Sequence, residues 1–191
     1  YILAVNSEGI VETYPANAPT NSILFILGDL PDLYSNNFEE DVEGWVVGDN
    51  SDNATAGIWE LAEPVATYND DNILIQPGED NTSNGTFCFI TGNGFESGNG
   101  GFDDVDAGKT TLYSPVFDCS GLDEVLLTYW RWYTNNIGDN GDNDKWVVSV
   151  SNDNSTWIDL ENTSVSNTDW TKKRFLLSNY IDLNSTVSFR F

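Results

Sequence analysis

The sequence predicts an all-β protein whose strands form an antiparallel sandwich. Short runs of β-branched and aromatic residues recur along the 191 residues, and clusters of Asn, Asp, Gly and Ser separate them. This spacing is typical of β-sandwiches. Apolar residues make up 39% of the chain and aromatic residues 13%, which indicates a packed core rather than a disordered chain.

The predicted strands follow one another along the whole chain. The first part contains the strand Ile2–Val5, a turn, a second strand, a loop between Pro15 and Pro19, and the strand Ile23–Leu27. In the second part, β-branched and aromatic runs bounded by turn residues predict the strands Gly44–Val47, Gly57–Leu61, Thr86–Thr91, Thr110–Phe117, Glu124–Tyr133, Lys145–Ser151, Thr156–Glu161, Thr171–Leu177 and Val187–Phe191.

A domain boundary is predicted near residues 28–36. Residues 1–32 are interpreted as a linker and the C-terminal strands of an upstream module, immunoglobulin-like or fibronectin-like, and residues 33–191 as one further domain. The chain contains no Met, and it begins and ends within strand patterns. We therefore expect it to be an internal piece of a longer precursor whose targeting signal lies upstream.

The charge excludes several classes of partner. The chain has 31 acidic and 7 basic residues, a net charge of −24, and such a surface repels nucleic acids and anionic lipid head groups. No apolar run approaches the roughly 20 residues of a membrane-spanning helix. We therefore expect no nucleic-acid partner and no membrane insertion.

The sequence offers few candidate catalytic residues. The chain has no His, which removes the commonest general base, His-dependent nucleophiles and imidazole zinc sites. Carboxylates are abundant, but no spacing distinguishes one pair as a glycosidase-like acid and base. The prediction is that this stretch is not an enzyme.

Two acidic clusters are candidate metal ligands. One is Asn37-Phe38-Glu39-Glu40-Asp41, and the other covers residues 103–108, with Asp104 and Asp106. Calcium takes six to eight oxygen ligands, which two such clusters could supply if a sandwich edge brought them together. The alternative is a solvated acidic surface.

The segment Tyr129-Trp130-Arg131-Trp132-Tyr133 is the main candidate for ligand binding. Side chains alternate across a strand, so Tyr129, Arg131 and Tyr133 share one face and the two tryptophans share the other. We expect the Tyr-Arg-Tyr face to bind a glycan and the Trp face to lie in the core. The alternative is that both faces are structural.

The two cysteines, Cys88 and Cys119, match no metal-binding or redox spacing. They form either a disulfide or two buried thiols that act as small apolar groups.

From about Asn37 the chain resembles the MAM-like jelly rolls of bacterial exported proteins, which include the cleaved-adhesin domains and the choice-of-anchor modules. The matching landmarks, in order, are Asn37-Phe38-Glu39 with Gly44-Trp45, residues 54–60 (ATAGIWE), residues 85–92 (GTFCFITG), Asp104-Val105-Asp106 leading into residues 110–118 (TTLYSPVFD), residues 129–133 (YWRWY), and Ser151-Asn152-Asp153 with Trp157. They cover roughly four-fifths of the chain.

The resemblance implies a two-sheet antiparallel jelly roll in an exported, many-module peptidase or adhesin of the Bacteroidetes, often secreted by the type IX route. It also implies a structural Ca²⁺ held by Glu39 with Asp104 or Asp106, and Asn37 as a lesser candidate. Family members carry an apolar residue where Cys119 stands, which favours a Cys88–Cys119 bond. They also continue into a closing strand beyond Phe191, so the domain is expected to lack that strand.

Together these features predict a non-catalytic adhesion, glycan-contact or spacer module of a secreted or cell-surface protein. Its expected partners are neighbouring domains of the same precursor and a glycan or cell-surface protein. The alternative is the accessory β-sandwich of a secreted hydrolase, a peptidase whose catalytic domain lies upstream.

Overall fold

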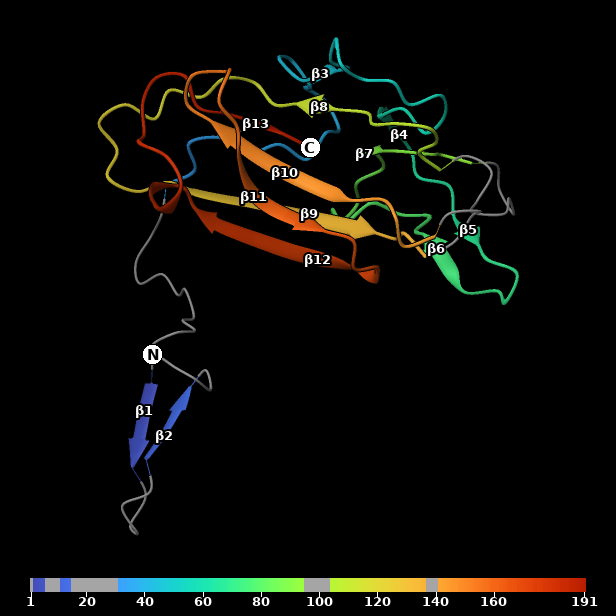
Figure 1. Cartoon of the computed structure of the whole chain (residues 1–191), viewed down its shortest axis with the longest axis horizontal. Coiled ribbons are helices and arrows are strands. Elements are labelled where there is room, and N and C mark those ends of the chain that lie inside the picture. The colour runs from blue at the N-terminus through green and yellow to red at the C-terminus, as the bar shows by residue number, and fades with distance from the viewer. Residues whose placement is uncertain (1, 6–10, 15–30, 95–103, 137–140) are drawn as a thin grey trace. The chain divides into compact units, whose positions relative to one another are not determined.

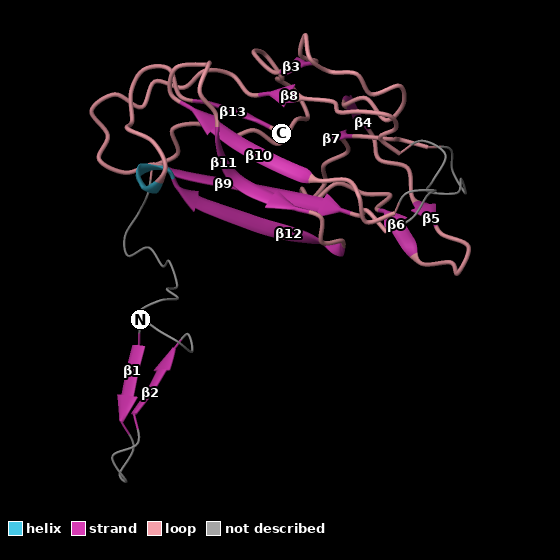
Figure 2. Cartoon of the chain, in the orientation of Figure 1, coloured by secondary structure: helices cyan, strands magenta, loops and turns pink. Residues whose placement is uncertain are grey.

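The computed structural model describes residues 2–5, 11–14, 31–94, 104–136 and 141–191 (Figure 1). Within them, regular structure is β-strand apart from one 3-10 turn, η1 (Leu177–Asn179) (Figure 2). The predicted all-β class is therefore confirmed. In the same ranges, no helix has the length and apolar character needed to cross a membrane.

The strands occur in the following order along the chain: β1 (Ile2–Val5), β2 (Val11–Tyr14), β3 (Val46–Val47), β4 (Glu60–Ala62), β5 (Thr67–Tyr68), β6 (Leu74–Gln76), β7 (Cys88–Ile90), β8 (Leu112–Tyr113), β9 (Leu126–Tyr133), β10 (Trp146–Ser151), β11 (Ile158–Thr163), β12 (Asn167–Leu176) and β13 (Ser188–Arg190).

The chain divides into two compact units, Tyr1–Ser35 and Asn36–Phe191. In the first unit, β1 and β2 pair antiparallel, with Ile2 opposite Tyr14 and Val5 opposite Val11. The predicted strand Ile23–Leu27 lies outside the described residues.

The main sheet of the second unit has five antiparallel strands in the order β11-β10-β13-β8-β3. The strand β10 lies inside this sheet, and its sequence Trp-Val-Val-Ser-Val-Ser alternates apolar and small polar residues. Val148 and Val150 point to the core and are fully buried. Ser149 and Ser151 are on the other face and are also fully buried, because polar side chains of neighbouring segments cover them.

A second sheet, the β9–β12 pair, packs against the core face of the first. The core cluster contains Val148, Val150, Val187 and Phe189 of the main sheet and its flanks, and side chains of β9 and β12 pack on it, namely Leu127, Tyr129 and Phe175. Each large apolar side chain buried in this way stabilises the fold by roughly 1.5–3 kcal/mol. The two layers form a β-sandwich, and the jelly-roll connectivity stays a prediction.

The core continues into an aromatic cluster. Phe38 makes edge-to-face contacts with Trp45 and Phe89, in each case with ring centroids 5.2 Å apart. Phe191 contacts Trp45 at 6.1 Å and Tyr129 at 5.4 Å. Such pairs add about 0.5–1.5 kcal/mol each beyond their burial. The aromatic cluster therefore connects the segment before β3 to β7, β9 and the last residue.

Two short hairpins complete the unit, β4–β7 and β5–β6. The strands β5 and β6 do not follow from the sequence pattern, because their two or three residues lie in a stretch rich in Asn, Asp and Gly. The strand predicted for Thr110–Phe117 is shorter in the structure, where only Leu112–Tyr113 is a strand and an isolated bridge joins Phe117 to Val187.

Candidate functional site

The face of β9 that carries Tyr129, Arg131 and Tyr133 points into the sandwich. The Arg131 side chain is 6% exposed and lies against Glu161 of β11, with 2.6 Å between Nη2 and Oε1. Its Nε also donates to both Glu161 oxygens, at 3.1 and 3.2 Å. Because Glu161 comes from the other sheet, this bidentate pair joins the two layers of the sandwich.

Two further donors complete the contacts of Glu161. The Tyr129 hydroxyl donates to Oε2 at 2.7 Å, and Lys173 of β12 lies with its Nζ 2.8 Å from Oε1. Burial alone would raise the pKa of Glu161, but the bonds from Arg131, Lys173 and Tyr129 outweigh burial and lower the pKa to about 2. The same burial, together with the bond to Glu161, raises the pKa of Tyr129.

The orientation predicted for β9 was therefore wrong. The Tyr-Arg-Tyr face is a structural contact between the layers and is not open to a glycan. The arginine guanidinium lies 5.8 Å from the ring centroid of Tyr133 and at the same distance from that of Trp146. A cation can lie inside this sandwich because a carboxylate and aromatic rings replace the water around it.

The opposite face of the β9–β12 pair is open, and it carries Trp130. The Trp130 side chain is 46% exposed, so it is not the core residue that was predicted. Lys172 is directly opposite Trp130 in the ladder, and its Nζ lies 5.6 Å from the indole centroid. Thr128 and Arg174 form the adjacent cross-strand pair, and both are exposed. We call these four residues the β9–β12 outer face.

The β9–β12 outer face is bounded at one end by two half-buried tryptophans, Trp132 and Trp170, whose rings meet edge to face at 6.2 Å. The indole N–H of Trp132 donates to the carbonyl of Ile75 at 2.6 Å, and that of Trp170 to the carbonyl of Glu79 at 3.4 Å. The segment that contains and follows β6 is therefore fixed beside this end, as Figure 1 shows.

The Phe-Glu motif forms a structural clamp. Phe38 has a φ of 65°, which is rare for a non-glycine residue, and the Asn36 side-chain oxygen accepts its N–H at 2.6 Å. One oxygen of Glu39 accepts the backbone N–H groups of Thr86 and Phe87, both at 2.8 Å. The segment before β3 is thus attached to the start of β7 by a ring contact and by a carboxylate.

The other expected calcium ligands are positioned by backbone contacts. The Asp106 backbone pairs with Ala56, and the Asp104 carbonyl lies where a Cβ on Gly57 would approach it to 2.6 Å. Gly57 also has a φ of 63°, so both space and conformation require glycine there. Asn37 accepts the N–H of Glu39 at 3.4 Å.

Within the described residues, no group of three or more Asp, Glu, Cys or His side chains is arranged to hold a metal ion. The calcium shell expected of Glu39 with Asp104 or Asp106, and Asn37 as a lesser candidate, stays a prediction.

Both cysteines are free thiols, which decides between the two alternatives that the sequence left open. Cys119 is buried in the core cluster. Burial raises the pKa of Cys88 to about 12, and the neighbouring Asp80 and Glu39 carboxylates raise it in the same direction. Neither thiol therefore has the thiolate character of a reactive cysteine.

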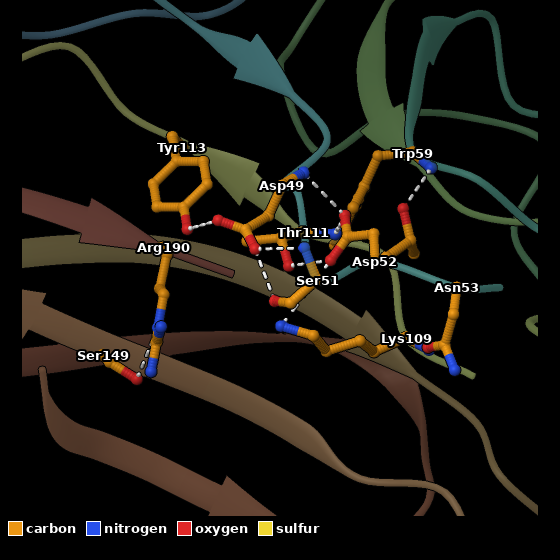
Figure 3. Close-up of polar contacts among 11 residues, drawn as sticks. Asp49, Ser51, Asp52, Asn53, Trp59, Lys109, Thr111, Tyr113, Ser149 and Arg190 are labelled. Atoms are coloured by element: carbon orange, nitrogen blue, oxygen red, sulfur yellow. Dashed lines mark hydrogen bonds and ion pairs between the residues drawn. The ribbon is translucent and has the colours of Figure 1, made fainter.

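A polar network around Asp49 was missed at the sequence level (Figure 3). Asp49 accepts the Tyr113 hydroxyl at 2.7 Å, and Asp52 accepts the Thr111 N–H at 2.8 Å and its hydroxyl at 2.7 Å. These bonds fasten the loop after β3 onto β8. The signal that could have found them is the turn Asp49-Asn50-Ser51-Asp52, in which Asp49 caps the N–H of Ser51 at 2.7 Å.

The same network extends across the outer surface of the main sheet. Tyr113 is opposite Arg190 in the ladder, and Arg190 is opposite Ser149. The Arg190 guanidinium lies 4.7 Å from the ring centroid of Trp157. Hydrogen bonds to Ser51, first of all, and then to Tyr113 hold the pKa of Asp49 well below its usual range. These residues satisfy one another, so we interpret the network as a structural brace.

Comparison with known proteins identified no relative, since no family model, no curated protein and no solved structure matches the chain. The MAM-like resemblance therefore stays a prediction.

Proposed function

We propose that residues 36–191 form a non-catalytic carbohydrate-contact module of an exported or cell-surface protein. The observation that carries this proposal is the exposed indole of Trp130 on the β9–β12 outer face, with Lys172 and Arg174 beside it. An exposed aromatic ring offers an apolar surface to the C–H face of a sugar, and its polar neighbours can bond the sugar hydroxyls. We propose that the module works beside neighbouring domains of the same precursor.

The contacts behind Trp130 favour a ligand-binding role for the module over a role as a spacer alone. Directly behind Trp130 on the same strands, Arg131 and Lys173 are held by Glu161 of the opposite sheet. The backbone under the ring is therefore anchored by charged hydrogen bonds as well as by the β-ladder. A platform fixed before binding loses less conformational entropy when a ligand arrives.

The test is retention of the whole chain by polysaccharides in affinity electrophoresis. Trp130→Ala should lower the affinity about thirtyfold, because truncating an aromatic hot-spot residue costs about 2 kcal/mol or more. The matched control is Tyr68→Ala, which removes an exposed ring from β5. Equal losses in both variants, or no retention by any polysaccharide, would refute the proposed function.

A further inference from the structure

The β9–β12 outer face carries two cations that no carboxylate of the described residues neutralises. The chain has 31 acidic residues and 7 basic ones. Among the described residues, Lys109 pairs with Asp52, and Arg131 and Lys173 both pair with Glu161. Lys172 and Arg174 form no ion pair within the same ranges, although acidic residues outnumber basic ones more than fourfold.

The register places these two cations next to each other on β12, opposite Trp130 and Thr128 of β9. Lys172 is opposite Trp130, and Arg174 is opposite Thr128, two residues farther along β12. Residues two apart on a strand are about 7 Å apart along it and point to the same face. The open face is therefore a strip with a ring and a hydroxyl on one strand and two cations on the other.

We infer that this strip, on which the proposed function rests, selects polysaccharides that carry carboxylates, namely polyuronates. Arg174 offers a planar fork of donors that matches a carboxylate, Lys172 offers a point charge, and Trp130 offers the stacking surface. A linear polymer needs only such a narrow strip. A stable protein interface would need about 800 Å² on each partner with an apolar centre, whereas the β9–β12 outer face offers one exposed ring.

The rest of the molecule imposes a particular salt dependence on this binding. A net charge of −24 repels a polyanion at long range, and the Debye length falls from about 30 Å at 0.01 M salt to about 8 Å at 0.15 M and 3 Å at 1 M. Moderate salt should screen the repulsion from distant acidic groups, while the short contacts to Lys172 and Arg174 persist. Retention should therefore rise between 0.01 and about 0.15 M NaCl and fall again towards 1 M.

The experiment compares polygalacturonate with its fully methyl-esterified form, which has the same backbone without the charge. The whole chain should be retained by the acid polymer about tenfold more strongly than by the ester. The double variant Lys172→Gln/Arg174→Gln should lose that preference. Lys145→Gln, which removes an exposed cation elsewhere, should keep it. Light scattering of each variant reports self-association in parallel.

The outcomes separate this inference from the proposed function. Equal retention by the acid and the ester, abolished by Trp130→Ala, would overturn the selection for carboxylates and leave carbohydrate contact intact. Failure of both polymers, together with no retention by any other polysaccharide, would overturn both. Self-association that disappears in the double variant, without retention, would assign the cations to an acidic protein surface and overturn the inference.

Discussion

At the scale of single residues, the pair of Arg131 and Glu161 determines how the sandwich interior is organised. Removing two charges from water costs several kcal/mol for each ion, and their attraction offsets that cost only when the geometry is good and the remaining donors are used. Here the contact is bidentate, and Tyr129 and Lys173 occupy further lone pairs of the carboxylate, whereas Arg131 Nη1 is buried without a hydrogen-bond partner among the described residues. The pair therefore fixes how the two sheets register against each other.

The mutual dependence of the pair can be tested by a double-mutant cycle. Glu161→Leu should lower the free energy of unfolding by about 3–5 kcal/mol, because it leaves the buried Arg131 charge without a carboxylate. Arg131→Met should lower it by less, because Lys173 and Tyr129 still bond Glu161. The double variant should lose clearly less than the sum, since no guanidinium is then left buried without its carboxylate. Urea unfolding followed by tryptophan fluorescence measures all four proteins. Additive losses would show that the two groups do not depend on each other.

The lowered pKa of Glu161 predicts a specific acid sensitivity. Its pKa is about 2 in the folded state and about 4.3 in an unfolded chain, so the folded state binds the proton less readily. The stability from the Glu161 carboxylate is therefore fully present above pH ~4.3 and is lost as the pH falls towards 2. The difference in unfolding free energy between the wild type and Glu161→Gln should be constant from about pH 6 to 5 and should narrow below pH ~4. A difference that does not change between pH 6 and 2 would contradict this assignment.

At the scale of elements, the segment before β3 is held by contacts rather than by a ladder. The Phe38 ring packs edge to face on both Trp45 and Phe89, and Glu39 accepts two amides just before β7. The left-handed φ of Phe38 costs on the order of 1–3 kcal/mol, which the ring contacts and the two hydrogen bonds offset. The Phe38-Glu39 motif therefore attaches the segment before β3 to the residues around β7.

A structural role and a calcium-binding role for Glu39 predict different effects of substitution on stability. Because one side-chain oxygen accepts both amides, Glu39→Gln should keep nearly all the stability, whereas Glu39→Ala should lose about 1–3 kcal/mol. The loss should be the same in calcium and in chelator. The melting temperature of each protein in both buffers provides the measurement. A wild type that calcium stabilises, with Glu39→Gln as damaging as Glu39→Ala, would support the calcium prediction and contradict a purely structural role for Glu39.

At the scale of the whole molecule, the net charge is large and negative. The chain carries a net charge of −24, and three ion pairs occur among the described residues. Repulsion among acidic groups destabilises the compact state, and salt screens this repulsion between exposed groups. The buried pair of Arg131 and Glu161 is screened much less. Salt should therefore weaken the repulsive part of the electrostatics more than the attractive part.

The melting temperature should accordingly rise by a few degrees as NaCl increases from 0.01 M to about 0.3 M. Circular dichroism or scanning calorimetry at several salt concentrations measures it. Glu161→Gln, which changes an acidic group inside the sandwich, serves as the control and should respond to salt in nearly the same way. A melting temperature that falls with added NaCl would mean that attractive surface pairs dominate the electrostatics.

The sequence by itself determined the fold class, the long strands at residues 124–133, 145–151 and 171–177, and the alternation of side chains along each strand. These features are local, since β-branched and aromatic runs with a period of two form strands in almost any context. It also determined the charge of −24, which predicts that the surface as a whole repels polyanions. The short strands β5 and β6 could not be predicted, because two or three residues carry too little pattern.

Only the tertiary structure decided which face of β9 is buried. Alternation assigned Tyr129, Arg131 and Tyr133 to one face and the tryptophans to the other, but it could not say which face meets the second sheet. That choice depended on Glu161, about 30 residues away along the chain, whose carboxylate allows Arg131 to be buried. The same contact left Trp130 in solvent with Lys172 opposite it. The proposed site therefore exists on that face because a charge is neutralised on the other, and such a pairing between distant residues leaves no trace in a local pattern.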